Sequence, residues 1–222
     1  MAGAVLVLDS GSPLVSVAVG RSGAVLAARS AEIARSSARL LAMVDATLRE
    51  AGLTVADLSG LVALAGPGSF TGLRIGLATV LGLHQVLGLP ATTLPTLRVL
   101  ASLAAMDSEH ALGAVDSLRG EWSVEEWTGG VGRGMELLPG AEIARFAPGA
   151  IVGFGISRLG QLPGWPAGVR LVEPGPLAPA ALPLLPPPGD PAWDPALLTV
   201  PIYARPPAVT APRPAVAARG ER

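Results

Sequence analysis

The stretch that decides the fold of this 222-residue chain is Gly66-Pro67-Gly68-Ser69-Phe70-Thr71-Gly72-Leu73-Arg74-Ile75-Gly76. It follows an apolar run, 61–65, that has the pattern of a buried strand, and it precedes a longer apolar stretch, 73–89, that has the length of a helix. The stretch is therefore predicted to be a glycine-rich turn between a strand and a helix. Such turns leave backbone N–H groups free at the start of the helix, where the hydroxyl of Ser69 or Thr71 can cap them.

Working outward from this turn, the first half of the chain has the predicted order β-β-β-α-β-α-β-α. The expected strands are 4–8, 14–19, 24–28, 61–65 and 91–94, and the expected helices are 32–51, 71–88 and 96–106. The first three strands are joined by short turns and predict an antiparallel meander. The first, fourth and fifth strands should be parallel, because helices connect them by right-handed crossovers.

The second half of the chain starts the same pattern again, because the apolar run at 112–115 ends in Asp116 as the run at 6–8 ends in Asp9. Further strands are expected at 124–127, 134–138, 150–152 and 169–172. Glycine and proline interrupt the chain from 159 to 195, so helices there should be short. The second half is therefore predicted to be a degenerate copy of the first.

The composition excludes several classes of site. The chain has no cysteine, which excludes disulfides, thiol nucleophiles and cysteine-ligated metals. All sixteen basic residues are arginine, so a phosphate-binding P-loop lysine and a Schiff-base lysine are also excluded. The formal net charge of −1 gives no overall attraction to nucleic acid or to an anionic membrane.

The apolar stretch 73–89 is the only candidate for a membrane span. It is about 17 residues long, at the lower limit for a span, and it contains Arg74, His84 and Gln85. The N-terminus lacks the basic region of a signal peptide, and Asp9 interrupts the first apolar run. We interpret the stretch as a buried helix in a cytoplasmic protein without membrane contact.

Four segments together resemble one protein family. They are the glycine-rich turn 66–76, the opening hairpin 5–19, the turn Asp116-Ser117-Leu118-Arg119-Gly120-Glu121, and Pro201-Ile202-Tyr203-Ala204-Arg205-Pro206-Pro207, which looks like a closing strand. This combination resembles the TsaB (YeaZ) family, the non-catalytic subunit of the bacterial machinery that makes threonylcarbamoyladenosine in tRNA. The resemblance covers residues 1–120 and 201–207, and it is loose between about 124 and 200.

The resemblance implies an α/β fold of the actin-like, ribonuclease H-like class, which also contains sugar kinases and Hsp70. Two tandem lobes of the ββαβα type are expected, the second degenerate. The first lobe would span 1–108 and contain dimerisation helices, the second would span 109–206, and 207–222 would be a disordered tail rich in proline, alanine and arginine.

The function implied by the resemblance is that of a scaffold. The chain would pair with a TsaD homologue and support transfer of a threonylcarbamoyl group to N6 of adenosine 37 in tRNA. An ATPase of the TsaE type would join the assembly, and the chain alone would form a homodimer. It would have no catalytic residue and no cofactor, and it would reach tRNA only through the complex.

A rival interpretation is an independent actin-fold ATPase or small-molecule kinase. In that superfamily, carboxylates at the positions of Asp9 and Asp116 face the nucleotide phosphates and magnesium. The alternative is that both carboxylates accept hydrogen bonds from their own turns, as aspartate commonly does. The rest of a nucleotide site is not recognisable in the sequence, which favours that alternative.

The sequence lacks the residues that a metal site or a serine hydrolase would need. The two histidines, His84 and His110, have no ligand spacing, and no carboxylate accompanies them in a metal-binding pattern. TsaD has a paired-histidine metal motif on its first helix, and the corresponding stretch here, 34–40, has no histidine. No nucleophile elbow is present, which argues against a serine hydrolase.

Trp122 and Trp127 could stack on bases, but packing within the protein is the better interpretation.

The helix 71–88 is apolar on all sides, so all its sides need to be covered. Gly72, Gly76, Thr79 and Gly82 form a stripe of small residues that would let another helix approach closely. We expect this helix and the helix 32–51 to form a partner surface; burial beneath helix 32–51 of the same chain is the alternative. The predicted signature and interface residues are Gly66, Pro67, Gly68, Ser69, Phe70, Thr71, Gly72, Arg74, Gly76, Val80 and Leu83.

Arg74 lies in the first turn of the predicted helix, where the helix dipole disfavours a cation. A specific acceptor is therefore expected to hold it, such as a carboxylate or a carbonyl across the subunit contact. The alternative is a solvated arginine, since exposed ion pairs contribute little stability.

Overall fold

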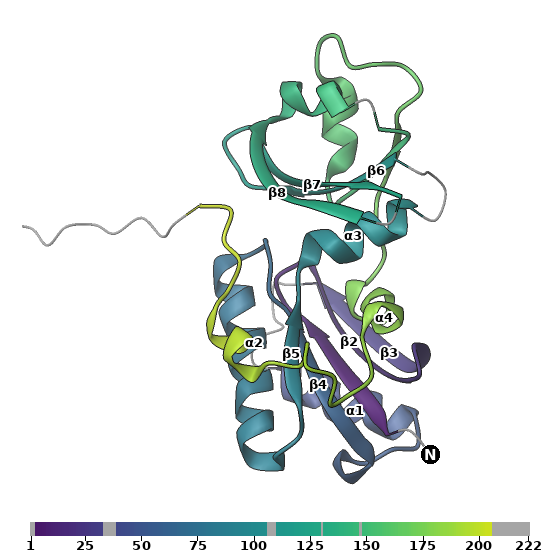
Figure 1. Cartoon of the computed structure of the whole chain (residues 1–222), viewed down its shortest axis with the longest axis vertical. Helices are drawn as coiled ribbons and strands as arrows, with labels where there is room; N and C mark the ends of the chain where they lie inside the picture. The colour runs from purple at the N-terminus through teal and green to yellow at the C-terminus, as the bar shows by residue number, and fades with distance from the viewer. Residues whose placement is uncertain (1–2, 33–38, 106–109, 130, 147, 206–222) are drawn as a thin grey trace, which may run out of the picture.

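The computed structural model describes residues 3–32, 39–105, 110–129, 131–146 and 148–205. They form two lobes, each built on a five-stranded sheet (Figure 1). The predicted division into two related halves is therefore present in the order of the strands.

The first sheet contains β1 (Ala4–Asp9), β2 (Leu14–Arg21), β3 (Ala24–Glu32), β4 (Leu58–Leu64) and β5 (Ala91–Leu94), in the order β3-β2-β1-β4-β5. The first three strands pair antiparallel, whereas β4 pairs parallel with both β1 and β5. Both the predicted meander and the predicted parallel strands are confirmed. Every residue of β1 is buried, as its nearly continuous apolar sequence requires of a central strand.

Helices cover both faces of this sheet. On one face, α1 (Leu40–Glu50) and α2 (Phe70–Leu87) pack against inward side chains such as Leu6 and Leu8. On the other face, α3 (Thr96–Ala105) and α4 (Leu177–Ala181) pack against Val5 and Val7. The alternation of side chains along β1 thus supplies two separate apolar cores.

The second sheet contains β6 (His110–Asp116), β7 (Glu121–Thr128), β8 (Val131–Pro139), β9 (Ala150–Val152) and β10 (Arg170–Val172), in the order β10-β9-β6-β7-β8. It repeats the first sheet, because β6, β7 and β8 form a meander while β9 pairs parallel with β6 and β10. Short 3-10 helices, Gly140–Phe146 and Ile156–Gln161, stand where the first lobe has long helices. The second half is the degenerate copy that the sequence predicts. Helix α3 packs at the junction of the two lobes (Figure 1).

Two predicted boundaries are wrong. The first helix begins at Leu40 rather than at residue 32, because β3 continues to Glu32 in register with Leu14 of β2. Residues 33–38, which lay inside that predicted helix, are outside the described part of the chain. At Glu32, pairing with β2 takes the place of the predicted start of the helix.

The second lobe also ends earlier than predicted. From Leu177 the chain returns to the first lobe, where α4 packs on β1 and β2, and the 3-10 helix Pro195–Thr199 packs on β5 and α2. The described part of the expected closing strand, 201–205, is not in a strand: Ile202 N donates one hydrogen bond to Ala65 O, at 2.7 Å, beyond the end of β4. The predicted tail, 207–222, lies outside the described residues.

Candidate functional site

The glycine-rich turn packs directly on the turn between β1 and β2. Ser69 N donates to Gly11 O at 2.8 Å, and Ser10 Oγ donates to Gly72 O at 2.7 Å. A Cβ atom on Gly72 would lie 2.0 Å from Ser10 O, and one on Gly68 would lie 2.6 Å from Gly11 O. Glycine is required at both positions because backbone touches backbone.

Helix α2 begins and ends as the sequence predicts. Ser69 caps its first turn by accepting a hydrogen bond from Gly72 N at 3.3 Å, and Gly88 ends it in the left-handed conformation with φ 66°. The predicted cap by Ser69 or Thr71 is thus supplied by Ser69. Glycine at the C-terminal end adopts the left-handed conformation without the strain of a Cβ.

The stripe of small residues on α2 is divided between two environments. A Cβ on Gly76 would lie 2.2 Å from Ser10 Oγ, so Gly72 and Gly76 both face the β1–β2 turn of their own lobe. Gly82, by contrast, has nothing within 4 Å of its Cβ position, and Thr79 is half-buried. Only the second part of the stripe is open to another helix.

Val80 cannot contact a partner, because its side chain is fully buried in the core of its own lobe. The prediction of Val80 as an interface residue is wrong, whereas Leu83 is half-buried at the edge of the same core. A helix that is apolar all round does not reveal from its sequence which side faces the sheet.

Arg74 is held within its own chain. Its Nε donates to Tyr203 Oη at 2.9 Å, and its guanidinium carbon lies 3.8 Å from the centroid of the Phe70 ring, an arrangement typical of a cation–π contact. The rings of Phe70 and Tyr203 stack with their centroids 4.9 Å apart. The prediction of a specific acceptor is correct, but the acceptor is a phenol of the same chain rather than a carboxylate or carbonyl across a subunit contact.

Asp9 is fully buried, and its Oδ1 accepts hydrogen bonds from Gly11 N at 3.1 Å and Ser12 N at 3.2 Å. Burial raises the pKa of Asp9 to about 6, and the Ser12 side chain and the two backbone N–H groups only partly oppose that rise. Its second oxygen, Oδ2, has no hydrogen-bond partner in the part of the chain that the structure describes. Asp9 therefore stabilises the β1–β2 turn by accepting hydrogen bonds on the buried side of that turn.

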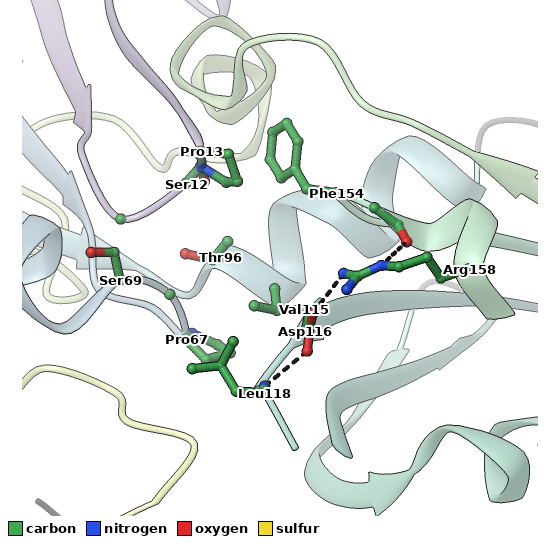
Figure 2. Close-up of a pocket in the computed structure, with 13 residues that line it drawn as sticks. Ser12, Pro13, Pro67, Ser69, Thr96, Val115, Asp116, Leu118, Phe154 and Arg158 are labelled. Carbon is green, nitrogen blue, oxygen red and sulfur yellow. Dashed lines mark hydrogen bonds and ion pairs between the residues drawn. The ribbon is translucent and has the colours of Figure 1, made fainter. Parts of the chain in front are cut away.

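A cleft of ≈ 480 Å³ opens between the lobes (Figure 2). Its wall in the first lobe consists of the β1–β2 turn, the glycine-rich turn and the start of α3, and its wall in the second lobe consists of the end of β6 and the segment 154–158. Asp9 is not part of the lining. The lining residues are Gly11, Ser12, Pro13, Pro67, Gly68, Ser69, Thr96, Val115, Asp116, Leu118, Phe154, Gly155 and Arg158.

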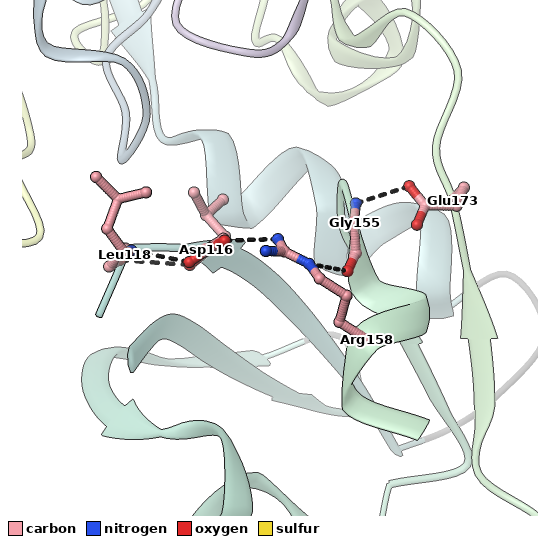
Figure 3. Close-up of polar contacts among 7 residues, drawn as sticks. Asp116, Leu118, Gly155, Arg158 and Glu173 are labelled. Atoms are coloured by element: carbon pink, nitrogen blue, oxygen red, sulfur yellow. Dashed lines mark hydrogen bonds and ion pairs between the residues drawn. The ribbon is translucent and has the colours of Figure 1, made fainter. Parts of the chain in front are cut away.

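Asp116 does line this cleft, but its carboxylate is already paired (Figure 3). Arg158 Nη2 lies 2.5 Å from Asp116 Oδ2, and Leu118 N donates to Oδ1 at 2.8 Å. Arg158 Nε also donates to Gly155 O at 3.1 Å. The sequence analysis missed Arg158, because nothing local in the sequence links residues 42 positions apart.

The two histidines and the two candidate tryptophans have contacts within the protein. His84 Nδ1 lies 2.7 Å from Leu89 O, and His110 Nε2 lies 2.7 Å from a carboxylate oxygen of Glu126. Within the described ranges, no group of three or more histidines and carboxylates could hold a metal ion. Trp122 is 4% exposed and packs in the core of the second lobe, while Trp127 is half-buried.

In the part of the chain that the structure describes, α2 alone meets the length and hydropathy criteria for a membrane-crossing helix. Its mean hydropathy is 1.3 and 28% of the 18-residue segment is buried. Core helices of globular proteins meet the same criteria, so this is weak evidence for a span.

Comparison with known proteins gives several related matches in sequence, among them one family model and two curated proteins. The family model described as "TsaD: tRNA N6-adenosine threonylcarbamoyltransferase" matches residues 30–123. An uncharacterized protein of Mycobacterium tuberculosis H37Rv is 42% identical over 89 residues, which are 39% of this chain and 42% of that protein. The tRNA threonylcarbamoyladenosine biosynthesis protein TsaB of Escherichia coli K12 is 33% identical over 119 residues, which are 53% of this chain and 52% of that protein.

The match in structure is more extensive. YeaZ from Pseudomonas aeruginosa is 28% identical with a TM-score of 0.67, and the alignment covers 82% of this chain and 89% of that one. The curated sequence relatives are matched over only about half of their length or less, 52% for the E. coli protein and 42% for the mycobacterial one. The two-lobed actin-like fold expected from the sequence is confirmed. The chain is therefore similar to TsaB/YeaZ proteins, in sequence over about half of its length and in fold over 82% of it.

Proposed function

We propose that this chain is a scaffold subunit in the synthesis of threonylcarbamoyladenosine in tRNA. It binds a TsaD homologue, which transfers the threonylcarbamoyl group to N6 of adenosine 37, and it contributes no catalytic residue. The similarity to E. coli TsaB supports the pathway. The observation that supports the scaffold role is the uncovered face of α2.

That face is apolar or small along the length of the helix. It is formed by Thr71, Ala78, Thr79, Gly82 and Val86, while Ile75 lies half-buried at its edge and packs against the core of the lobe. Val86 is 83% exposed, and Gly82 leaves an open space where a second helix can approach. On α1, which covers the same side of the sheet, Leu41 is 60% exposed. Contiguous exposed apolar residues mark interaction surfaces.

The rival function, phosphoryl transfer by Asp9 and Asp116, has less support. The Asp116 carboxylate is paired with Arg158, and the Asp9 carboxylate is buried behind the cleft. Neither is placed to hold a magnesium ion between nucleotide phosphates and the protein. The chain also lacks lysine, and therefore a lysine for the phosphates.

Further parts of the proposal concern the assembly. A TsaE-type ATPase joins the complex, and the tRNA is contacted through TsaD rather than by this chain alone. Without a TsaD homologue, the same surface on α1 and α2 pairs two copies of this chain. Such an assembly works in the cytoplasm, where the tRNA is.

We expect Val86→Glu to weaken binding to the TsaD homologue by about 100-fold or more, because it places a charge in an apolar contact that excludes water. The fold should be unaffected, since Val86 is 83% exposed. The matched control is Val131→Glu on β8 of the second lobe, where the valine is 67% exposed. Calorimetric titration of both variants with the TsaD homologue measures the difference. Equal affinity of Val86→Glu and wild type would place the interface elsewhere.

A further inference from the structure

The cleft between the lobes contains a buried polar group that has no hydrogen-bond partner among the described residues. Thr96 begins α3 and is 2% exposed, and its backbone N donates to Gly66 O at 2.7 Å. Within the described ranges, its hydroxyl oxygen, Oγ1, has no hydrogen-bond partner, although Thr96 lines the cleft (Figure 2). A buried hydroxyl without a partner costs free energy, so it marks a place where a ligand can supply the missing bond.

Two helices begin at the same wall of the cleft. Ser69 caps α2 and Thr96 starts α3, and both residues line the cleft. The N-terminal ends of helices present unpaired backbone N–H groups and a partial positive charge. Together with the free hydroxyl of Thr96, they form an environment that favours a small anion.

The charged side chains that line the cleft have no net charge, so we expect the anion to carry a single negative charge. Of the described residues that line the cleft, only Asp116 and Arg158 are charged, and they neutralise each other. A nucleoside triphosphate needs cations to bind its phosphates. The chain has no lysine, and the described residues include no cluster of carboxylates that could hold a metal counter-ion. A single carboxylate needs only the Thr96 hydroxyl as a donor, together with the partial positive charge of the two helix ends.

The rest of the cleft is apolar. Pro13, Pro67, Val115 and Phe154 line it, and its volume of ≈ 480 Å³ lies in the range of small-molecule sites. Leu118, in the hairpin turn between β6 and β7, also lines the cleft and is 71% exposed.

We propose that the cleft between the lobes binds a small monocarboxylate with an apolar body. The carboxylate lies at the start of α2 and α3 and accepts a hydrogen bond from Thr96 Oγ1. The apolar body packs between Pro13 and Pro67 on one side and Phe154 on the other. This site is separate from the α1–α2 surface, so it does not depend on the scaffold role.

The test uses benzoate as the probe, with calorimetric or NMR titration of the full chain. We expect half-saturation at about 1 mM or tighter, as a ligand of this size allows. Acetate, which lacks the apolar body, and benzyl alcohol, which lacks the charge, should each bind at least about tenfold more weakly, because each omits one of the two kinds of contact.

Thr96→Val replaces the hydroxyl with a methyl group of similar size and should weaken benzoate binding about tenfold, as expected for loss of a hydrogen bond to a charged group. Thr96→Ser should restore most of the affinity. Thr79→Val on α2, outside the cleft, makes the same chemical change and should have no effect. Unfolding curves establish that each variant is folded.

Three results would overturn the proposal. The first is that benzoate fails to bind the wild-type chain. The second is that benzoate binds Thr96→Val as tightly as wild type while Thr96→Val is folded. The third is that ADP with magnesium displaces benzoate and binds the cleft more tightly than benzoate does, which would make the cleft a nucleotide site.

Discussion

Replacing Gly72 with alanine is expected to lower the free energy of unfolding by about 3 kcal/mol, even though alanine is the better helix former. The added Cβ would lie 2.0 Å from Ser10 O, which belongs to the backbone and cannot rotate away. The turn between β1 and β2 would have to move, and the 2.7 Å hydrogen bond from Ser10 Oγ to Gly72 O would be strained or lost.

The matched control lies ten residues further along the same helix. Gly82→Ala should stabilise the chain by about 0.5–1 kcal/mol, because its Cβ meets open space and the helix gains propensity. Urea unfolding of both variants measures the two effects. If both substitutions changed stability in the same direction and by similar amounts, the contact between the glycine-rich turn and the β1–β2 turn would not have the role assigned to it here.

The second large effect concerns the pH dependence of stability. The pKa of Asp9 rises from its ordinary value of 3.8 to about 6 on folding, because the carboxylate is buried. A carboxyl whose pKa is raised in the folded state binds its proton more tightly there, so its contribution is fully present below pH 3.8 and is lost as the pH rises through about 6. The shift corresponds to about 3 kcal/mol in total, about half of it between pH 5 and pH 8.

Asp9→Asn removes this titration while keeping an oxygen that accepts from Gly11 N and Ser12 N. The difference in unfolding free energy between wild type and the variant should therefore shift against the wild type as the pH increases from 4 to 8. Chemical denaturation at several pH values measures this shift. A difference that stays constant over the whole range would mean that Asp9 has an ordinary pKa in the folded chain.

Much of the architecture could be predicted because local sequence patterns indicate where the strands and helices lie. The strands 4–8 and 61–65 are apolar runs bounded by turns. The helices that connect them to each other and to the strand 91–94 predict that all three are parallel. The repeat of this order after residue 110 was visible for the same reason. The cap at Ser69 and the stop at Gly88 follow from the chemistry of helix ends.

What the sequence did not reveal depends on contacts between distant residues. The return of the chain to the first lobe after Leu177 occurs in a proline-rich segment without periodicity, so no pattern indicated which sheet it would cover. Arg74 pairs with Tyr203, and Asp116 pairs with Arg158, across long separations in sequence. Val80 and Gly82 are two positions apart on an evenly apolar helix, and only the packed sheet decides which of them faces inward.

The scaffold role is tested most directly by the yield of threonylcarbamoyladenosine in tRNA when the chain is combined with a TsaD homologue and the other components. If the chain is a scaffold, the double variant Asp9→Asn with Asp116→Asn should support full yield, because neither carboxylate takes part in the transfer. Val86→Glu should lower the yield in proportion to its lost affinity for TsaD. Loss of modification in the double variant, with its fold and TsaD affinity intact, would contradict the scaffold account and favour catalysis by this chain.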